Sequence, residues 1–237
     1  MIEIRSGVEL PSVREDFTLV TGDNLTLVGE LAMPVAGNPV ATLVTLHPLP
    51  TAGGFMDSHV LRKAANRLPA LANLAVVRFN TRGTESPRGK SEGVFGEGVT
   101  ERHDVEAAVK FAEARGLPNI WLVGWSFGTE LALKYGHDKN IVGVILLSPP
   151  LHRTSEEELR VWANNGKRVI ALVPELDDYL VPDQAKERFA ALSQLELVAV
   201  DGAKHLWVGE VATKRVLDEI VKAVNPSVYP LPEVYNP

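Results

Sequence analysis

The sequence of 237 residues contains no cysteine. Disulfide bridges, thiolate nucleophiles and cysteine-ligated metal centres are therefore excluded, because each of them needs a thiol. The six histidines also form no H-E-x-x-H or H-x-H pair of the kind that binds a catalytic metal ion. From these absences we expect a protein that works without a metal ion or other cofactor.

Long apolar runs and an excess of basic charge are also missing. The longest apolar runs, such as residues 141–147, are far shorter than the about 20 residues that a membrane-spanning helix needs. Lysine and arginine number 24 against 30 acidic residues, which gives a net charge of −6. Because nucleic acids and anionic membranes attract basic faces, we expect neither as a partner. Residues 1–7 do not resemble a secretory signal, so a cytoplasmic location is predicted, and the oligomeric state is left open.

What the sequence does have is an ordered alternation of short apolar runs and longer amphipathic segments. Several short runs consist almost entirely of Val, Ile and Leu, which is typical of strands buried on both faces of a parallel sheet. We expect strands at residues 16–20, 25–32, 41–46, 75–79, 120–124, 142–147, 169–173 and 196–200. We expect helices at residues 58–71, 101–115, 127–137, 156–164, 183–192 and 211–224.

This order of elements predicts a single α/β domain that spans residues 1–225. From residue 41 onward strands and helices alternate, which predicts right-handed crossovers and a parallel sheet with helices on both faces. The first two strands carry more polar residues and are expected to form an antiparallel hairpin at one edge. Residues 226–237 contain four prolines, and we expect this tail to be a disordered end.

A candidate nucleophile lies in the segment Gly124-Trp125-Ser126-Phe127-Gly128, which reads G-x-S-x-G. A predicted strand precedes this segment and a predicted helix follows it. In such a sharp turn, the small residues let strand and helix pass closely, and the serine hydroxyl is raised to the carboxyl edge of the sheet. The N-terminus of the helix, including the Phe127 amide, then points at negative charge that forms there.

A serine hydroxyl needs a base, and His205 is the best candidate. It is the only histidine beyond the last predicted strand, and a loop at that place lies on the same sheet edge as Ser126. A carboxylate after the preceding strand could hold the imidazole in the required tautomer. Three acids compete for this role in the segment that follows residues 169–173: Glu175, Asp177 and Asp178.

Acyl transfer also needs hydrogen-bond donors for the developing oxyanion, and the loop after residues 41–46 is expected to supply one. This loop reads His47-Pro48-Leu49-Pro50-Thr51. Proline has no amide hydrogen, so Leu49 is the one residue between the ends of this loop that can donate from the backbone. We therefore expect the amides of Leu49 and Phe127 to form the oxyanion hole and His47 to be structural.

Together these segments resemble the α/β-hydrolases, in particular the small, lidless proteins similar to dienelactone hydrolase that are often described as predicted esterases. The resemblance covers residues 17–224. It is carried by the segments His47-Pro48-Leu49-Pro50, Gly53-Gly54-Phe55-Met56-Asp57, Arg78-Phe79-Asn80-Thr81-Arg82-Gly83, Gly124-Trp125-Ser126-Phe127-Gly128, Ser148-Pro149-Pro150 and Gly202-Ala203-Lys204-His205. The family implies an eight-stranded, mostly parallel sheet and a Ser–Asp–His triad.

The resemblance also implies a choice between two of the acids. Family members usually read G-x-x-D-x-x-V-P at the acid loop. Alignment on Val181 and Pro182 makes Asp178 the triad acid and puts Glu175 in place of the family's glycine. Alignment on Pro174 gives Asp177 instead. We favour Asp178.

Only residues 151–167 separate two strands at the point where larger members of this fold carry a cap. We therefore expect a shallow, open site with at most a one-helix flap bearing Trp162. Trp125, Tyr179 and Trp207 are expected to contact an apolar part of the substrate. The sequence favours a serine hydrolase of small or medium carboxylic esters, with thioesters, lactones and short peptides left open. The alternative is a catalytically weak relative that binds a ligand or acts as a scaffold.

Overall fold

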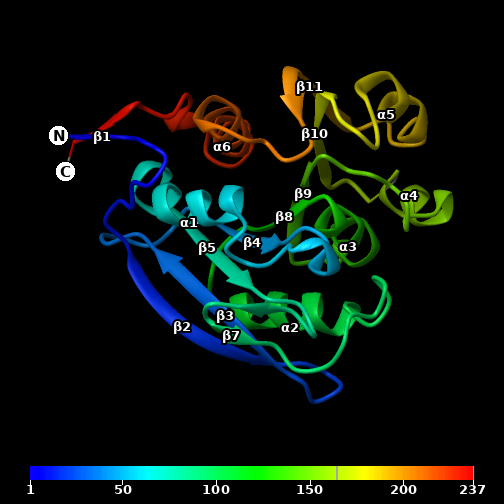
Figure 1. The fold of residues 1–237 in the computed structure, drawn as a ribbon, viewed down its shortest axis with the longest axis horizontal. Helices are drawn as coiled ribbons and strands as arrows, with labels where there is room; N and C mark the ends of the chain where they lie inside the picture. Colours follow the sequence, from blue (N-terminus) through cyan, green and yellow to red (C-terminus); the bar gives the residue numbers. More distant parts are fainter. Residues whose placement is uncertain (164, 237) are drawn as a thin grey trace.

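The computed structural model describes residues 1–163 and 165–236, which are built around one large sheet (Figure 1). Its strands, in chain order, are β2 (Val13–Val20), β3 (Thr26–Met33), β4 (Ala41–Leu46), β5 (Leu74–Phe79), β8 (Ile120–Trp125), β9 (Ile141–Leu147), β10 (Arg168–Leu176) and β11 (Leu195–Lys204). Their spatial order is β11-β10-β9-β8-β4-β5-β3-β2. Strands β2 and β3 form the antiparallel edge. The other six strands, which are β5, β4, β8, β9, β10 and β11 in spatial order, run parallel. The predicted eight-stranded, mostly parallel sheet is confirmed.

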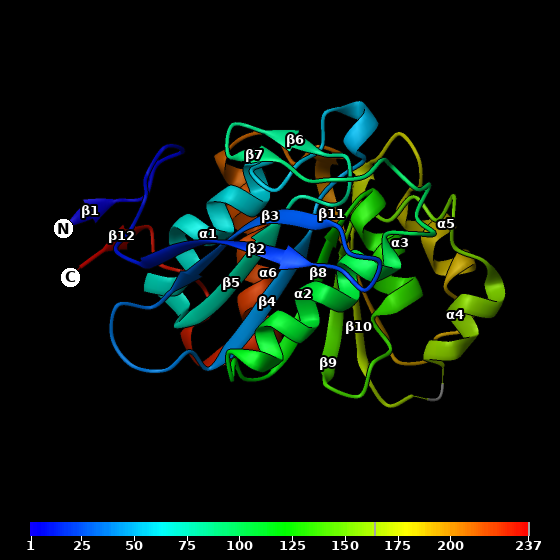
Figure 2. The ribbon, with the colours of Figure 1, turned by 90° about the horizontal axis from the view of Figure 1, so that it is seen from below.

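Helices cover both faces of the sheet, as the alternating pattern predicts (Figures 1 and 2). Within the described residues the six α-helices are α1 (His59–Ala72), α2 (Arg102–Ala114), α3 (Phe127–Tyr135), α4 (Glu156–Trp162), α5 (Pro182–Arg188) and α6 (Glu210–Val224). Helices α1 and α6 pack on one face with one apolar cluster, and the other four contribute to the cluster on the opposite face. Each helix lies within a few residues of its expected position. The expected end of α4, at Asn164, falls outside the described residues.

The segment between β9 and β10 contains one short helix, α4, and the described part of it forms no cap. A capping box stabilises the start of α4: Ser155 Oγ accepts a bond from the Glu158 amide, and the Glu158 carboxylate accepts one from the Ser155 amide. Trp162 is fully buried, and its Nε1 donates to the Leu133 carbonyl at 2.8 Å. The expectation of a flap bearing Trp162 is therefore wrong, because this side chain fixes α4 to the core.

The two ends of the chain lie side by side and pair with each other (Figure 2). Strand β1 (Ile2–Glu3) forms an antiparallel pair with β12 (Val234–Tyr235), and the Ile4 amide donates to the Glu233 carbonyl at 2.9 Å. Leu231 is buried against the cluster beneath α6. The expectation of a disordered tail is wrong for residues 226–236, because an apolar anchor and a strand pairing hold them; Pro237 lies outside the described residues.

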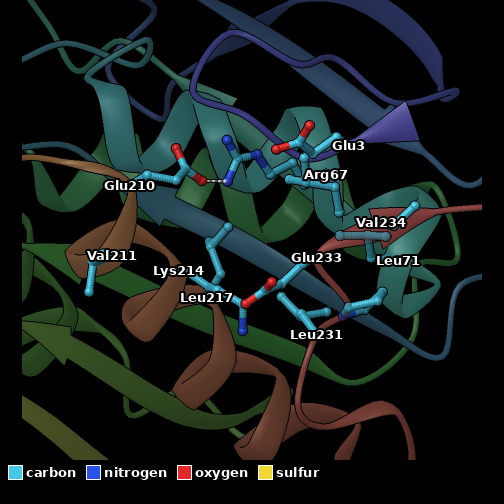
Figure 3. Close-up of a pocket in the computed structure, with 12 residues that line it drawn as sticks. Glu3, Arg67, Leu71, Glu210, Val211, Lys214, Leu217, Leu231, Glu233 and Val234 are labelled. Carbon is cyan, nitrogen blue, oxygen red and sulfur yellow. Dashed lines mark hydrogen bonds and ion pairs between the residues drawn. The ribbon is translucent and has the colours of Figure 1, made fainter. Parts of the chain in front are cut away.

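A cavity of about 360 Å³ lies between this terminal pair and helices α1 and α6 (Figure 3). Its walls combine apolar side chains such as Leu71 and Leu217 with Arg67, which is paired with Glu210. This cavity shares no lining residue with the pocket that contains Ser126. Among the described residues, no helix has both the length and the apolar character that crossing a membrane requires.

Candidate active site

Ser126 lies in the sharp turn that joins β8 to α3, as predicted. Its backbone has φ 53° and ψ −117°, a conformation that L-residues rarely adopt. A Cβ atom on Gly124 would lie 2.3 Å from the Gly128 carbonyl oxygen, and one on Gly128 would lie 2.0 Å from the Leu46 carbonyl oxygen. Both glycines are therefore needed for the close approach that holds Ser126 in this conformation.

The structure brings His205 and an aspartate to this serine. His205 directly follows β11, and its Nε2 lies 2.9 Å from Ser126 Oγ. Its Nδ1 lies 2.9 Å and 3.0 Å from the two carboxylate oxygens of Asp177. His205 and Asp177 are both buried. A carboxylate on Nδ1 favours the tautomer with its proton there, which leaves Nε2 free to accept the serine proton.

The aspartate beside His205 is Asp177, so the choice of Asp178 is wrong. Strand β10 extends to Leu176, three residues beyond its expected end, and Asp177 is the first residue after it. Its Oδ1 also accepts a bond from the Tyr179 amide at 2.9 Å, which fixes the turn with the carboxylate directed at His205. Asp178 is exposed to solvent. The third candidate, Glu175, accepts a bond from the Gly202 amide at 2.7 Å and so ties β10 to β11.

Two residues that line the pocket around Ser126 have backbone amides without a hydrogen-bond acceptor in the part of the chain that the structure describes. Within the described residues, no carbonyl or side chain accepts a hydrogen bond from the amide of Leu49 or of Phe127. Both residues line the same pocket as Ser126 and His205. The Leu49 carbonyl accepts bonds from the amides of Ala52 and Gly54 at 3.0 Å and 2.9 Å, which fixes this loop. The arrangement can offer two preorganised donors to an anion beside Ser126.

His47 supports the loop that carries Leu49. It is buried, and its Nε2 accepts a hydrogen bond from the Thr81 amide at 3.0 Å, while Nδ1 donates to the Pro48 carbonyl at 2.7 Å. Burial lowers the pKa of His47 from 6.5 to about 4, because the charged form loses its hydration. The imidazole is therefore neutral near pH 7 and links the loop to the segment after β5.

The pocket around Ser126 is small, with a volume of about 160 Å³. Of the three expected substrate contacts, Tyr179 alone lines it, with its ring centroid 4.6 Å from that of His205. Trp125 and Trp207 are both buried in the cluster beneath α1 and α6 and do not line the pocket. Those two expectations are wrong, because the sequence does not indicate which face of the sheet an aromatic side chain joins.

Several lining residues were not anticipated from the sequence. Glu130 and Arg153 carry charge to the pocket wall, and His152, Pro150 and Leu206 complete it. The spacing of Ser126 and Glu130 on α3 was the available signal, since residues four apart share one face of a helix. Within residues 1–163 and 165–236, no group of three or more His, Asp or Glu side chains is placed to hold a metal ion.

Comparison with solved structures agrees with this fold. No protein-family model and no curated protein matches the sequence. Among solved structures, an α/β serine hydrolase homologue from Coxiella burnetii is 26% identical, with a TM-score of 0.74 over 89% of this chain and 97% of its own. A lidless α/β serine hydrolase from Xanthomonas campestris is 24% identical, with a TM-score of 0.72 over 97% and 99%. An esterase from Pyrococcus furiosus is 20% identical, with a TM-score of 0.70 over 94% and 98%.

The fold of this chain is therefore that of the α/β-hydrolase superfamily. Its structural neighbours include serine hydrolases, one of them without a lid, and an esterase. The neighbour that is 26% identical is a serine hydrolase homologue, which supports a hydrolase role for the chain.

Proposed function

We propose that the protein is a serine hydrolase that cleaves a small or medium carboxylic ester through an acyl-enzyme on Ser126. The observation that carries the proposal is the chain of contacts from Ser126 Oγ to His205 Nε2 and from His205 Nδ1 to Asp177, each at 2.9 Å. Nucleophile, base and orienting carboxylate are thus within hydrogen-bond reach before any substrate binds.

In the proposed reaction, His205 Nε2 takes the proton of Ser126 while Oγ attacks the ester carbonyl. The resulting oxyanion accepts hydrogen bonds from the amides of Leu49 and Phe127. As the C–O bond breaks, the proton on His205 passes to the leaving alcohol. A water molecule, activated by the same imidazole, then hydrolyses the acyl-enzyme and releases the carboxylic acid. The charge of Asp177 stabilises the imidazolium in both steps.

The size of the pocket, and the absence of a cap in the described part of the segment between β9 and β10, favour a small-molecule substrate. A volume of about 160 Å³ is comparable to a cavity that holds one benzene-sized group. Tyr179 and Leu49 provide apolar contacts for that group. We therefore place simple carboxylic esters first, ahead of thioesters, lactones and peptides, which pass through the same type of tetrahedral intermediate.

The first test is covalent labelling of the pure protein with a fluorophosphonate probe, with the adduct located by mass spectrometry. We expect an adduct on Ser126 that is absent in Ser126→Ala and forms far more slowly in His205→Ala. The exposed His137 provides the matched control, and His137→Ala should label like the wild type. A folded wild-type protein that does not label would contradict the proposal and favour a ligand-binding or scaffold role.

The pair of neighbouring aspartates tests the triad more finely. Asp177→Asn should lower kcat by roughly 10³–10⁴-fold, because an amide on Nδ1 no longer favours the productive tautomer or stabilises the imidazolium. Asp178→Asn should change kcat less than twofold, because this side chain is exposed and does not contact His205. Steady-state hydrolysis of one activated ester by the two variants measures both values. Equal losses in the two variants would contradict the assignment of Asp177.

A further inference from the structure

Arg153 is a charged side chain in the wall of the small pocket that the proposed reaction does not use. It lies in the segment between β9 and α4 and lines the pocket together with Ser126 and His205. Its side chain is 30% exposed, so part of it faces open space. Most surface arginines serve solubility alone, so a role in the pocket requires that the Arg153 side chain be held in place.

Three contacts hold the guanidinium of Arg153. It lies over the ring of Phe127 with 5.7 Å from Cζ to the ring centroid. Nη2 donates to a carboxylate oxygen of Glu97 at 3.2 Å, and Nη1 lies 3.5 Å from Oε2 of Glu130. The backbone amide of Arg153 also donates to Glu130 Oε1. A guanidinium fixed in this way loses little conformational entropy when it binds a ligand.

Glu130 relates this guanidinium to the nucleophile. It follows Ser126 by four residues on α3, so its backbone lies one turn, roughly 6 Å, further along the helix axis. Glu130 is completely buried, and Oε2 accepts no hydrogen bond among the described residues. A buried carboxylate is costly without a cation beside it, so Glu130 holds Arg153 in the wall of the pocket that Ser126 also lines.

The hydrogen-bonding capacity of Arg153 is largely unused. A guanidinium has five N–H donors, and within the described residues only the bond to Glu97 meets hydrogen-bond geometry. The remaining donors have no acceptor among the described residues, and Arg153 lines the pocket, so a substrate bound there can supply one. Two carboxylates already face this one cation, so a third negative charge would be repelled. An uncharged oxygen, such as that of a ketone or an ether, is the acceptor that fits.

We propose that Arg153 makes the site selective for small esters that carry an uncharged acceptor oxygen a few bonds from the scissile carbonyl. This inference rests on the proposed ester hydrolysis. Within it, Arg153 is a specificity-determining residue that touches the substrate, and Glu130 is a positioning residue that acts through Arg153.

The test compares kcat/KM for two matched pairs of small esters. Methyl 4-oxopentanoate against methyl pentanoate places the ketone in the acyl part. The pair 3-oxobutyl acetate and butyl acetate places it in the alcohol part. We expect the wild type to prefer the ketone in one pair by about tenfold, the scale of one hydrogen bond to a charged donor. In Arg153→Met the ratio of kcat/KM for the ketone ester to kcat/KM for its matched ester should fall to about one.

Arg160→Met is the matched control, because Arg160 is an exposed arginine on α4 that pairs with Glu156; it should keep the wild-type preference. If Arg153→Met does not fold, Arg153→Lys replaces it. A lysine ammonium can still neutralise Glu130, but it lacks the planar set of N–H donors of a guanidinium. The preference for the ketone ester should therefore fall at least threefold. Equal kcat/KM values within both pairs for the wild type, or a preference that survives in a folded Arg153 variant, would overturn the proposal. No hydrolysis of any of the four esters would instead count against ester hydrolysis itself.

Discussion

At the scale of single residues, His47 couples the acid stability of the protein to its candidate oxyanion loop. Its pKa of about 4 is depressed by burial, whereas in the unfolded chain it returns to about 6.5. As the pH falls from 6.5 towards 4, the unfolded chain therefore binds a proton that the folded state does not. This contribution lowers stability by about 1.4 kcal/mol for each pH unit in that window.

The variant His47→Gln tests this coupling. Glutamine can still accept the Thr81 amide hydrogen bond but does not titrate. Between pH 7 and pH 5, the free energy of unfolding of the wild type should fall by about 2 kcal/mol more than that of the variant, because about 1.5 units of this interval lie below the unfolded pKa. Urea denaturation at the two pH values measures the difference. Parallel losses in both proteins would show that His47 is not the coupled group.

The residues of the site differ in how far the sequence could predict them. Ser126 and His205 were predictable, because a strained turn and a loop after the last strand are set by local pattern and chain order. The aspartate was not, because a shift of one residue at the end of a strand reverses the direction of the side chain. The run that ends at Val173 is apolar, but β10 continues through Pro174, Glu175 and Leu176, and this extension places Asp177 at the sheet edge.

At the scale of elements, the loop that carries His205 is fixed by three side chains from other elements. Trp125 Nε1 at the end of β8 and Ser148 Oγ after β9 each donate to the His205 carbonyl at 3.1 Å. His59, the first residue of α1, donates from Nε2 to the Leu206 carbonyl at 2.7 Å. The His59 and Trp125 rings also meet edge to face, with centroids 5.2 Å apart. These contacts hold the imidazole of His205 over Ser126.

His59→Ala removes one of these contacts while leaving the Ser126, His205 and Asp177 side chains in place. We expect kcat to fall roughly tenfold with KM nearly unchanged, because a loosened loop misplaces the base rather than the substrate. The rate of fluorophosphonate labelling should fall in parallel. His59→Gln, which restores an N–H donor, should recover part of kcat. A change confined to thermal stability would show that the contact is structural only.

The boundaries of most elements followed from periodicity, whereas the partners of their side chains did not. Strands β4, β8 and β9 were expected almost residue for residue, since short runs of Val, Ile and Leu mark a buried parallel strand. The same runs do not predict on which face of the sheet the Trp125 side chain lies. Its hydrogen bond to His205, 80 residues away, depends on how β8 and β11 are placed in the sheet.

At the scale of the whole molecule, the paired termini form one wall of a cavity that shares no lining residue with the pocket around Ser126. Local composition gave no sign of this, because a segment rich in proline is typical of disordered ends and the pairing of β1 with β12 joins residues more than 230 apart in sequence. What holds the tail is a tertiary contact. Leu231 is 5% exposed, and its amide donates to Asp218 Oδ1 on α6 at 2.9 Å.

Leu231→Ala should therefore lower the free energy of unfolding by about 2–3 kcal/mol, because a buried leucine loses its apolar contacts and leaves a cavity. Val211 is the matched control: it lines the same cavity (Figure 3) but is 87% exposed, so Val211→Ala should change stability by less than about 0.5 kcal/mol. Chemical denaturation gives both values. Ester hydrolysis by folded Leu231→Ala should match the wild type, since the terminal cavity and the pocket around Ser126 share no lining residue. Equal stability of Leu231→Ala and Val211→Ala would show that the tail contributes nothing to the stability of the fold. A loss of activity in Leu231→Ala with unchanged stability would show that the paired termini are coupled to the site.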